Sequence, residues 1–82
     1  MQLKWLEDFI TLAQERSFTR AAELRNVTHP AFGRRIRALE EWAGTPLVER
    51  SGSPVTLTTA GASFLETANQ LAHNLAQSHE EL

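Results

Sequence analysis

The spacing of apolar and polar positions divides the chain into four helical segments and one short extended region. Near the N-terminus, five apolar residues fall on one face of a helix: Leu3, Leu6, Phe9, Ile10 and Ala13. We predict a helix over about 2–15 that serves to build the core. Glu7 and Asp8 lie early in this helix, where its dipole favours negative charge.

A second, shorter helix is predicted over residues 17–24. Ser17 is the better N-cap candidate and Thr19 the alternative, because a side-chain hydroxyl accepts a hydrogen bond from a free amide of the first turn. The adjacent Ala21 and Ala22 allow another helix to approach closely. Residues 25–27 then form a tight connection, and we expect Val27 to pack under the core.

The third helix, over about 28–41, has the clearest start. Thr28 can cap it, and Pro30 falls where a missing backbone N–H costs nothing. Four apolar residues recur at helical spacing and predict a face turned towards the core: Phe32, Ile36, Leu39 and Ala43.

The opposite face of this third helix carries cations and small residues, and no acid occurs before Glu40. It consists of His29, Pro30, Gly33, Arg34 and Arg37. A helix with a slim, basic outer face and an apolar inner face suits insertion into the major groove of DNA. A solvated helix face is the alternative. Two short helices joined by a tight connection also match the helix-turn-helix pattern.

A small β-hairpin is predicted after the third helix, which Gly44 can terminate. Residues 47–50 and 55–57 have strand character and flank the turn-forming segment 51–54. The hairpin would form a wing beside the helix-turn-helix. Arg50 in this wing can reach a phosphate or the minor groove, and an exposed arginine without a role is the alternative.

One long helix of about 24 residues is predicted from Thr58 onwards, capped by Thr58 or Thr59. Its apolar and small residues alternate at spacings of four and three up to the last residue: Leu57, Gly61, Phe64, Ala68, Leu71, Leu75, Ser78 and Leu82. The small body cannot cover so long a seam, so the far half requires a partner helix, unless this end is simply frayed. Because the sequence ends inside this helix, we expect a fragment of a longer protein.

The composition indicates one small globular domain: 82 residues, 41% of them hydrophobic, with no cysteine. Without cysteine there is no disulfide and no cysteine-bearing zinc site, as is usual for intracellular proteins. No apolar run approaches the ~20 residues of a membrane span, and the N-terminus lacks a signal-peptide pattern. We therefore expect a cytoplasmic protein that does not associate with membranes.

The net charge of −2 argues, taken alone, against binding to nucleic acid. Its distribution changes that picture. Residues 16–50 contain seven arginines and four glutamates, whereas the segments on either side are both net negative. The guanidinium group of arginine suits phosphates and guanine edges better than the ammonium group of lysine.

Catalytic and metal chemistry is not expected. The three histidines, His29, His73 and His79, are too scattered for a metal site. The adjacent pairs 40–41 and 80–81 are glutamates that point apart on a helix and are interpreted as solvated charge. No glycine-rich phosphate loop and no nucleophile with a base occur. We predict no catalytic residue, no cofactor and no metal.

Together, these segments resemble the N-terminal DNA-binding domain of LysR-type transcriptional regulators, a bacterial-type family. The resemblance rests on Leu6 and Phe9, on residues 17–22, on Pro30-Ala31, on Ile36, Leu39 and Glu40, on the pattern Gly44-x-Pro46-Leu47-Val48-x-Arg50, and on Leu57-Thr58-x-x-Gly61. It implies a mainly α fold, a winged helix-turn-helix of three helices plus a short β-hairpin wing over 1–57. A linker helix over 58–82 would follow and pair with its counterpart in a homodimer. The resemblance also implies a C-terminal α/β domain, absent here, that binds a small-molecule effector.

Family roles transfer to matching positions. Thr28 stands where the family usually has serine and keeps a hydroxyl that can reach a phosphate. His29 replaces a glutamine that contacts a base edge, and it offers one good hydrogen bond where glutamine offers two. Pro30 and Arg34 match the family. Gly33 replaces a serine, which removes a polar contact and lets DNA come closer, at a cost to the helix of roughly 1 kcal/mol relative to alanine.

The sequence therefore predicts a dimeric transcriptional regulator that binds double-stranded DNA at an inverted-repeat operator. Helix 28–41 would enter the major groove, and the wing near 50–54 would contact the flanking backbone or minor groove. The predicted DNA-contacting residues are Ser17, Thr19, Arg20, Thr28, His29, Pro30, Gly33, Arg34, Arg35, Arg37, Arg50, Ser51 and Ser53. Arg35 and Arg37 are assigned to phosphates. The predicted dimerisation residues are Phe64, Ala68, Leu71, Leu75 and Leu82. The alternative is a winged-helix module that does not bind DNA and binds proteins through the seam of its long helix and its Trp5 and Trp42 surfaces.

Overall fold

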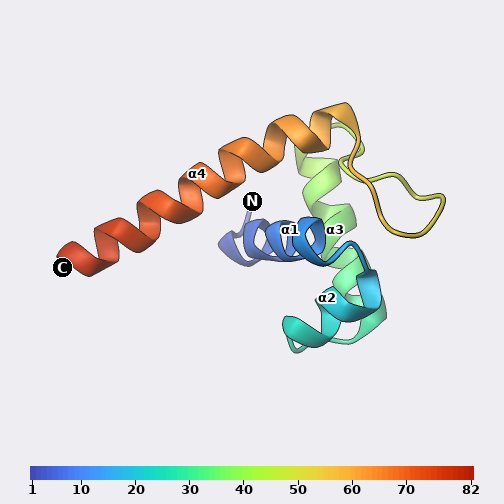
Figure 1. The fold of residues 1–82 in the computed structure, drawn as a ribbon, viewed down its shortest axis with the longest axis horizontal. Helices are drawn as coiled ribbons and strands as arrows, with labels where there is room; N and C mark the ends of the chain where they lie inside the picture. The colour runs from blue at the N-terminus through green and yellow to red at the C-terminus, as the bar shows by residue number, and fades with distance from the viewer.

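The computed structural model describes all 82 residues and contains four helices. They are α1 (Leu3–Glu15), α2 (Phe18–Leu24), α3 (His29–Ala43) and α4 (Thr59–Glu81). Helix α1 lies at the centre, because it packs against each of the other three. Helix α4 passes α1 and then continues away from the body to the C-terminus (Figure 1). No helix is both long enough and apolar enough to cross a membrane.

The helix starts and ends follow local sequence signals. Ser17, Thr28 and Thr58 each accept a hydrogen bond from the backbone amide three residues later, at 3.1, 3.2 and 2.9 Å. Gly44 ends α3 in the left-handed conformation, with a φ of 77°. The four predicted helices are thereby confirmed, with Ser17 rather than Thr19 as the cap of α2.

The core is built from α1, α2, α3 and the segment that follows α3. Its buried members are Phe9, Leu12, Ala21, Ala22, Phe32, Ile36, Leu39, Leu47 and Val48, and Val27 packs against them as predicted. Helix α4 joins this core at its N-terminal end, where the rings of Phe64 and Phe9 lie 5.6 Å apart. Gly61 allows this approach, because a Cβ there would lie 1.9 Å from the carbonyl oxygen of Leu47.

The predicted β-hairpin wing is not present as a sheet. One isolated antiparallel bridge pairs Val48 with Leu57, supported by a hydrogen bond from the amide of Glu49 to the carbonyl of Thr56 at 2.9 Å. Beyond this bridge the chain forms a loop that protrudes from the body (Figure 1).

Several backbone amides beside the bridge are bonded to groups outside the hairpin. The amides of Leu47 and Val48 donate to one carboxylate oxygen of Glu40, at 2.7 and 3.2 Å. The amide of Val55 donates to the carbonyl of Arg16 at the end of α1, at 3.0 Å. Of these amides only that of Leu47 faces the opposite strand, and on the other side of the bridge Pro54 has no N–H to donate, so the ladder does not extend.

The seam of α4 divides into two halves. Ala68 is fully buried, and Phe64 packs against α1, so these two residues are used within the chain. Leu71 and Leu75 are 43% and 51% exposed, and Leu82 is fully exposed. The body of the chain therefore covers the first half of the seam and leaves its outer half exposed, and whether this half pairs with a second copy stays a prediction.

Candidate nucleic-acid interface

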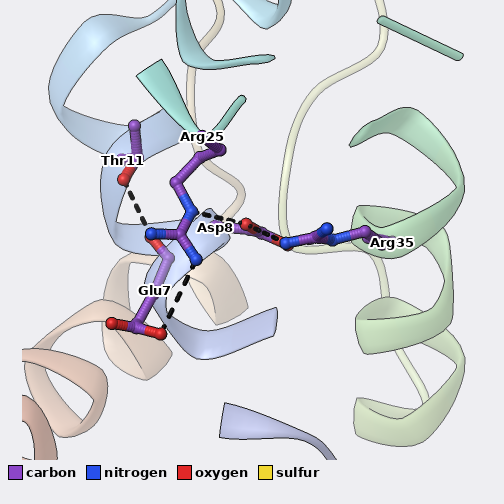
Figure 2. A network of polar contacts seen from close by, with 5 residues as sticks. All are labelled: Glu7, Asp8, Thr11, Arg25 and Arg35. Carbon is purple, nitrogen blue, oxygen red and sulfur yellow. Dashed lines mark hydrogen bonds and ion pairs between the residues drawn. The ribbon is translucent and has the colours of Figure 1, made fainter. Parts of the chain in front are cut away.

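A buried ion-pair network connects α1, α2 and α3 (Figure 2). Its centre is Asp8, whose side chain is fully buried. Arg25, at the C-terminal end of α2, donates from Nε to one oxygen of Asp8 at 2.8 Å. Arg35 of α3 donates through Nε and Nη2 to the two oxygens, at 2.6 and 2.7 Å. Arg25 also lies 3.6 Å from a carboxylate oxygen of Glu7. The network therefore fixes three helices to one another.

Two predictions about this network are corrected. Neither Glu7 nor Asp8 lies in the first turn of α1, where its dipole would favour negative charge, and Asp8 faces the core. Arg35 was expected to hold a phosphate, but its guanidinium points inwards to Asp8 and its side chain is 22% exposed. One sequence signal pointed to the burial of Asp8: it follows Trp5 by three residues and precedes Leu12 by four, which places an acid among apolar residues of α1.

Glu40 forms a second polar centre, so the prediction of a solvated Glu40 was wrong. Its side chain is 12% exposed, and it pairs with Arg50 in addition to accepting the two backbone amides described above. The guanidinium of Arg50 lies over the ring of Phe18, 5.6 Å from its centroid. Arg50 is thus held between α3 and α2, beside the helix-turn-helix.

The N-terminal half of α3 presents unpaired cations on its outer side. Arg34 and Arg37 are exposed and have no carboxylate within ion-pairing distance. His29 and Pro30 are exposed on the same half of the helix. The arginines that do pair with carboxylates are Arg20, Arg25, Arg35 and Arg50. Free positive charge on α3 is therefore confined to the side that faces away from the core.

An open hollow lies on this side and is called the α3 hollow below. It has a volume of about 490 Å³ and is lined by Phe18, His29, Pro30, Gly33, Arg34, Arg37 and Arg50. No carboxylate lines it. The ring of Phe18 forms one wall and lies 6.0 Å from the ring of His29. The structure therefore brings six of the predicted DNA-contacting residues together around one concave surface.

The remaining predicted contact residues lie outside the hollow. The hydroxyls of Ser17 and Thr28 cap α2 and α3, and Thr19 is exposed in the first turn of α2. Arg20 is exposed, with Glu15 and Glu23 at 3.7 and 3.6 Å. Two serines, at positions 51 and 53, are exposed in the loop after the bridge. Sequence reasoning missed Phe18, which shapes the hollow through its ring.

The comparisons with known proteins agree on one family. Residues 3–62 match the family model described as "Bacterial regulatory helix-turn-helix protein, lysR family". The chain is 43% identical to the HTH-type transcriptional regulator YjiE of Escherichia coli K12, and the match covers all of this chain and 27% of that protein. The chain therefore spans about a quarter of the length of that relative.

Solved structures show the same fold. The chain superposes with a TM-score of 0.94 on Vibrio fischeri DarR in complex with DNA, at 47% identity, covering 99% of this chain and 28% of that one. It superposes with a TM-score of 0.94 on the DNA-binding domain of BenM, an Acinetobacter baylyi regulator, in complex with catB site 1 DNA. That match has 36% identity and covers 98% of this chain and 86% of that domain.

Proposed function

The chain belongs to the lysR family of bacterial regulatory helix-turn-helix proteins, and from this premise we propose that it is the DNA-binding and dimerisation module of a transcriptional regulator. Its function is to bind double-stranded DNA rather than to catalyse a reaction. Effector sensing, which the family resemblance implies, falls outside these 82 residues.

The observation that carries the proposal is the outer side of α3. Arg34 and Arg37 are exposed and unpaired there, and no carboxylate lines the hollow beside them. Unpaired arginines on a slim helix can donate to guanine edges and to phosphates without first breaking an ion pair. Four of the other five arginines pair with glutamate or aspartate, and Arg16 is the one unpaired arginine that lies away from this surface.

In the proposed complex, the N-terminal half of α3 lies in the major groove. His29, Pro30 and Arg34 contact base edges, and Arg37 contacts the phosphate backbone. Thr19 and Arg20 approach the backbone from the start of α2. The loop after the bridge, with exposed serines at 51 and 53, contacts the flanking DNA. Arg35 is left out of this set, because Asp8 holds its guanidinium inside the body.

The test is fluorescence anisotropy with an inverted-repeat duplex that the chain selects from a random library, compared with a scrambled duplex of equal length. We expect tighter binding to the selected duplex, and a steep linear fall of log K with log salt concentration, because phosphate contacts release counterions. If the library yields no selected duplex and the chain binds no duplex at low salt, the proposal is wrong.

Dimerisation is proposed through the outer half of α4. Leu71 and Leu75 are large, exposed and one helical turn apart, so they form an apolar strip that a second copy of α4 can cover. Sedimentation velocity should show a dimer that Leu71→Ser with Leu75→Ser converts to a monomer. Gln77→Ser, on the same exposed half, is the matched control and should remain dimeric. A monomeric parent chain would contradict the proposal.

A protein-interaction module is the second candidate. Trp42 is 55% exposed, and its ring lies 6.3 Å from that of Phe64 along a groove between α3 and α4. Large exposed aromatic groups of this kind are enriched at protein interfaces. The absence of any DNA binding in the anisotropy experiment would favour this candidate.

A further inference from the structure

Gly33 has no explanation within the protein. Glycine destabilises the interior of a helix relative to alanine, and each of the other glycines has a structural reason. Gly61 allows α4 to approach Leu47, and Gly44 and Gly52 adopt positive φ angles of 77° and 87°. Gly33 has an ordinary helical backbone, and a Cβ placed on it would meet nothing within 4 Å. Nothing within the chain therefore requires a glycine at this position, and the space beside it is open to a group from outside.

The space beside Gly33 is the α3 hollow, and its chemistry indicates what enters. Arg34, Arg37 and Arg50 all line it, together with the imidazole of His29, and no acid does. Guanidinium groups that converge on one concave surface suit an oxyanion, because each can donate two parallel N–H bonds to it.

We propose that the α3 hollow seats one backbone phosphate of the bound DNA, and that Gly33 is the residue whose missing side chain admits it. Arg37 and Arg50 donate to the phosphate oxygens from the two sides of the hollow. This inference rests on the proposed function, since it assigns a specific DNA group to the same surface.

A phosphate fits the hollow better than the methyl group of a thymine. A thymine methyl could contact only Pro30 and the ring of Phe18, whereas three guanidinium groups line the hollow. The guanidinium of Arg50 already lies over that ring, 5.6 Å from its centroid. A group entering the hollow therefore meets N–H donors.

Arg50 is held in place before DNA arrives. Glu40 accepts from Nη2 of Arg50, and the ring of Phe18 supports its guanidinium. Glu40 itself does not line the hollow, and its carboxylate also accepts the amides of Leu47 and Val48. The remaining N–H groups of Arg50 are thus available to a phosphate, and little side-chain freedom is lost when they bind it.

The test combines Gly33→Leu with a set of duplexes in which one phosphate at a time is replaced by a neutral methylphosphonate. The parent duplex is the one selected from the random library. At one position, the methylphosphonate should weaken the unmodified chain about tenfold, because a charge-assisted contact is lost. Gly33→Leu should weaken binding to the parent duplex by a similar factor. It should also lower the slope of log K against log salt concentration by about 1.

The deciding result is non-additivity. The methylphosphonate that weakens the unmodified chain should have no further effect on Gly33→Leu, while other positions affect both proteins equally. Binding of Arg37→Ala should likewise be unaffected by the methylphosphonate at this one position. Leucine favours helix more than glycine does, so the thermal midpoint of Gly33→Leu should not fall, and lost affinity cannot be attributed to unfolding.

Three outcomes would overturn the inference. If Gly33→Leu keeps full affinity, or if it stays sensitive to every methylphosphonate, no phosphate occupies the hollow, although the proposed function stands. If replacing one thymine by uracil weakens binding of the unmodified chain but not of Gly33→Leu, the hollow holds a base methyl group instead. If no duplex is selected at all, the proposed function fails and this inference fails with it.

Discussion

Arg34 and Arg35 are neighbours in the sequence, yet they serve opposite sides of α3. Arg35 points to α1 and donates twice to the buried Asp8. Arg34 points away from the body, has no carboxylate partner and lines the α3 hollow. We call Arg25 and Arg35 the inner arginines, and Arg34 and Arg37 the outer arginines. The comparison shows that the role of an arginine in this domain depends on the side of the helix that it occupies and not on the local density of positive charge.

The strongest test of the inner arginines is Asp8→Ala. Without the carboxylate, two guanidinium groups face a buried space with no counter-charge, so we expect the free energy of unfolding to fall by about 3 kcal/mol. Urea denaturation followed by circular dichroism measures this change. Glu7→Ala is the control, because Glu7 is half-exposed and lies 3.6 Å from Arg25, and its loss should cost about 0.5 kcal/mol or less. A loss below about 1 kcal/mol for Asp8→Ala would contradict the structural role of the network.

Substitutions of the neighbouring Arg35 and Arg34 test the different roles of the inner and outer arginines. Arg35→Ala should lower the free energy of unfolding by about 2 kcal/mol, because Asp8 loses two of its three hydrogen bonds. Arg34→Ala should leave stability within about 0.5 kcal/mol and weaken DNA binding about tenfold, since an exposed contact residue is removed. Urea denaturation and anisotropy on the same two proteins test both statements. Equal losses of stability would end the distinction between inner and outer arginines.

Glu40→Gln tests a smaller effect on the side of α3 next to Arg50. The amide oxygen of glutamine can still accept the amides of Leu47 and Val48, but the ion pair with Arg50 is lost. We expect the free energy of unfolding to fall by about 1 kcal/mol. Glu41→Gln provides the matched control, because Glu41 is exposed and pairs with no cation. If the two variants unfold at the same urea concentration, Glu40 does not anchor Arg50.

The smallest effect is expected from Lys4→Ala. Lys4 is exposed on α1 and unpaired, so it carries the same free charge as an outer arginine but lies on a different helix. DNA affinity should change by less than about twofold at physiological salt, where screening limits charges that do not touch the DNA. A loss comparable to that of Arg34→Ala would show that total charge, rather than position on α3, governs binding.

Local features of the fold were predictable because their causes are local. Thr28 and Gly44 limit α3 through contacts within a few residues, and the four-three spacing in α4 marks its seam. The outer face of α3 was equally predictable, since helical periodicity places Arg34 and Arg37 opposite Phe32 and its apolar neighbours.

The non-local contacts were not predictable in this way. Asp8 meets Arg25 and Arg35 across 17 and 27 positions of the chain, and nothing near Asp8 in the sequence indicates its partners. The hairpin was predicted from strand propensity and the turn-forming segment 51–54, whereas the carboxylate of Glu40, on another helix, accepts the amide of Leu47 that could have joined the ladder. Propensity cannot anticipate a competitor that arrives through tertiary packing.

The burial of Asp8 has a consequence for how α3 can dock during folding. The apolar face of α3 must be buried while the carboxylate of Asp8 receives its hydrogen bonds. Only one rotation of α3 about its own axis directs both Phe32 and Arg35 inwards. Turning the helix by one residue would bring Arg34 towards Asp8 but would expose the apolar face, and turning it the other way would leave the carboxylate buried without its second partner. A residue of α1 that is fully enclosed in the body thus selects which side chains of α3 the protein presents to its surroundings.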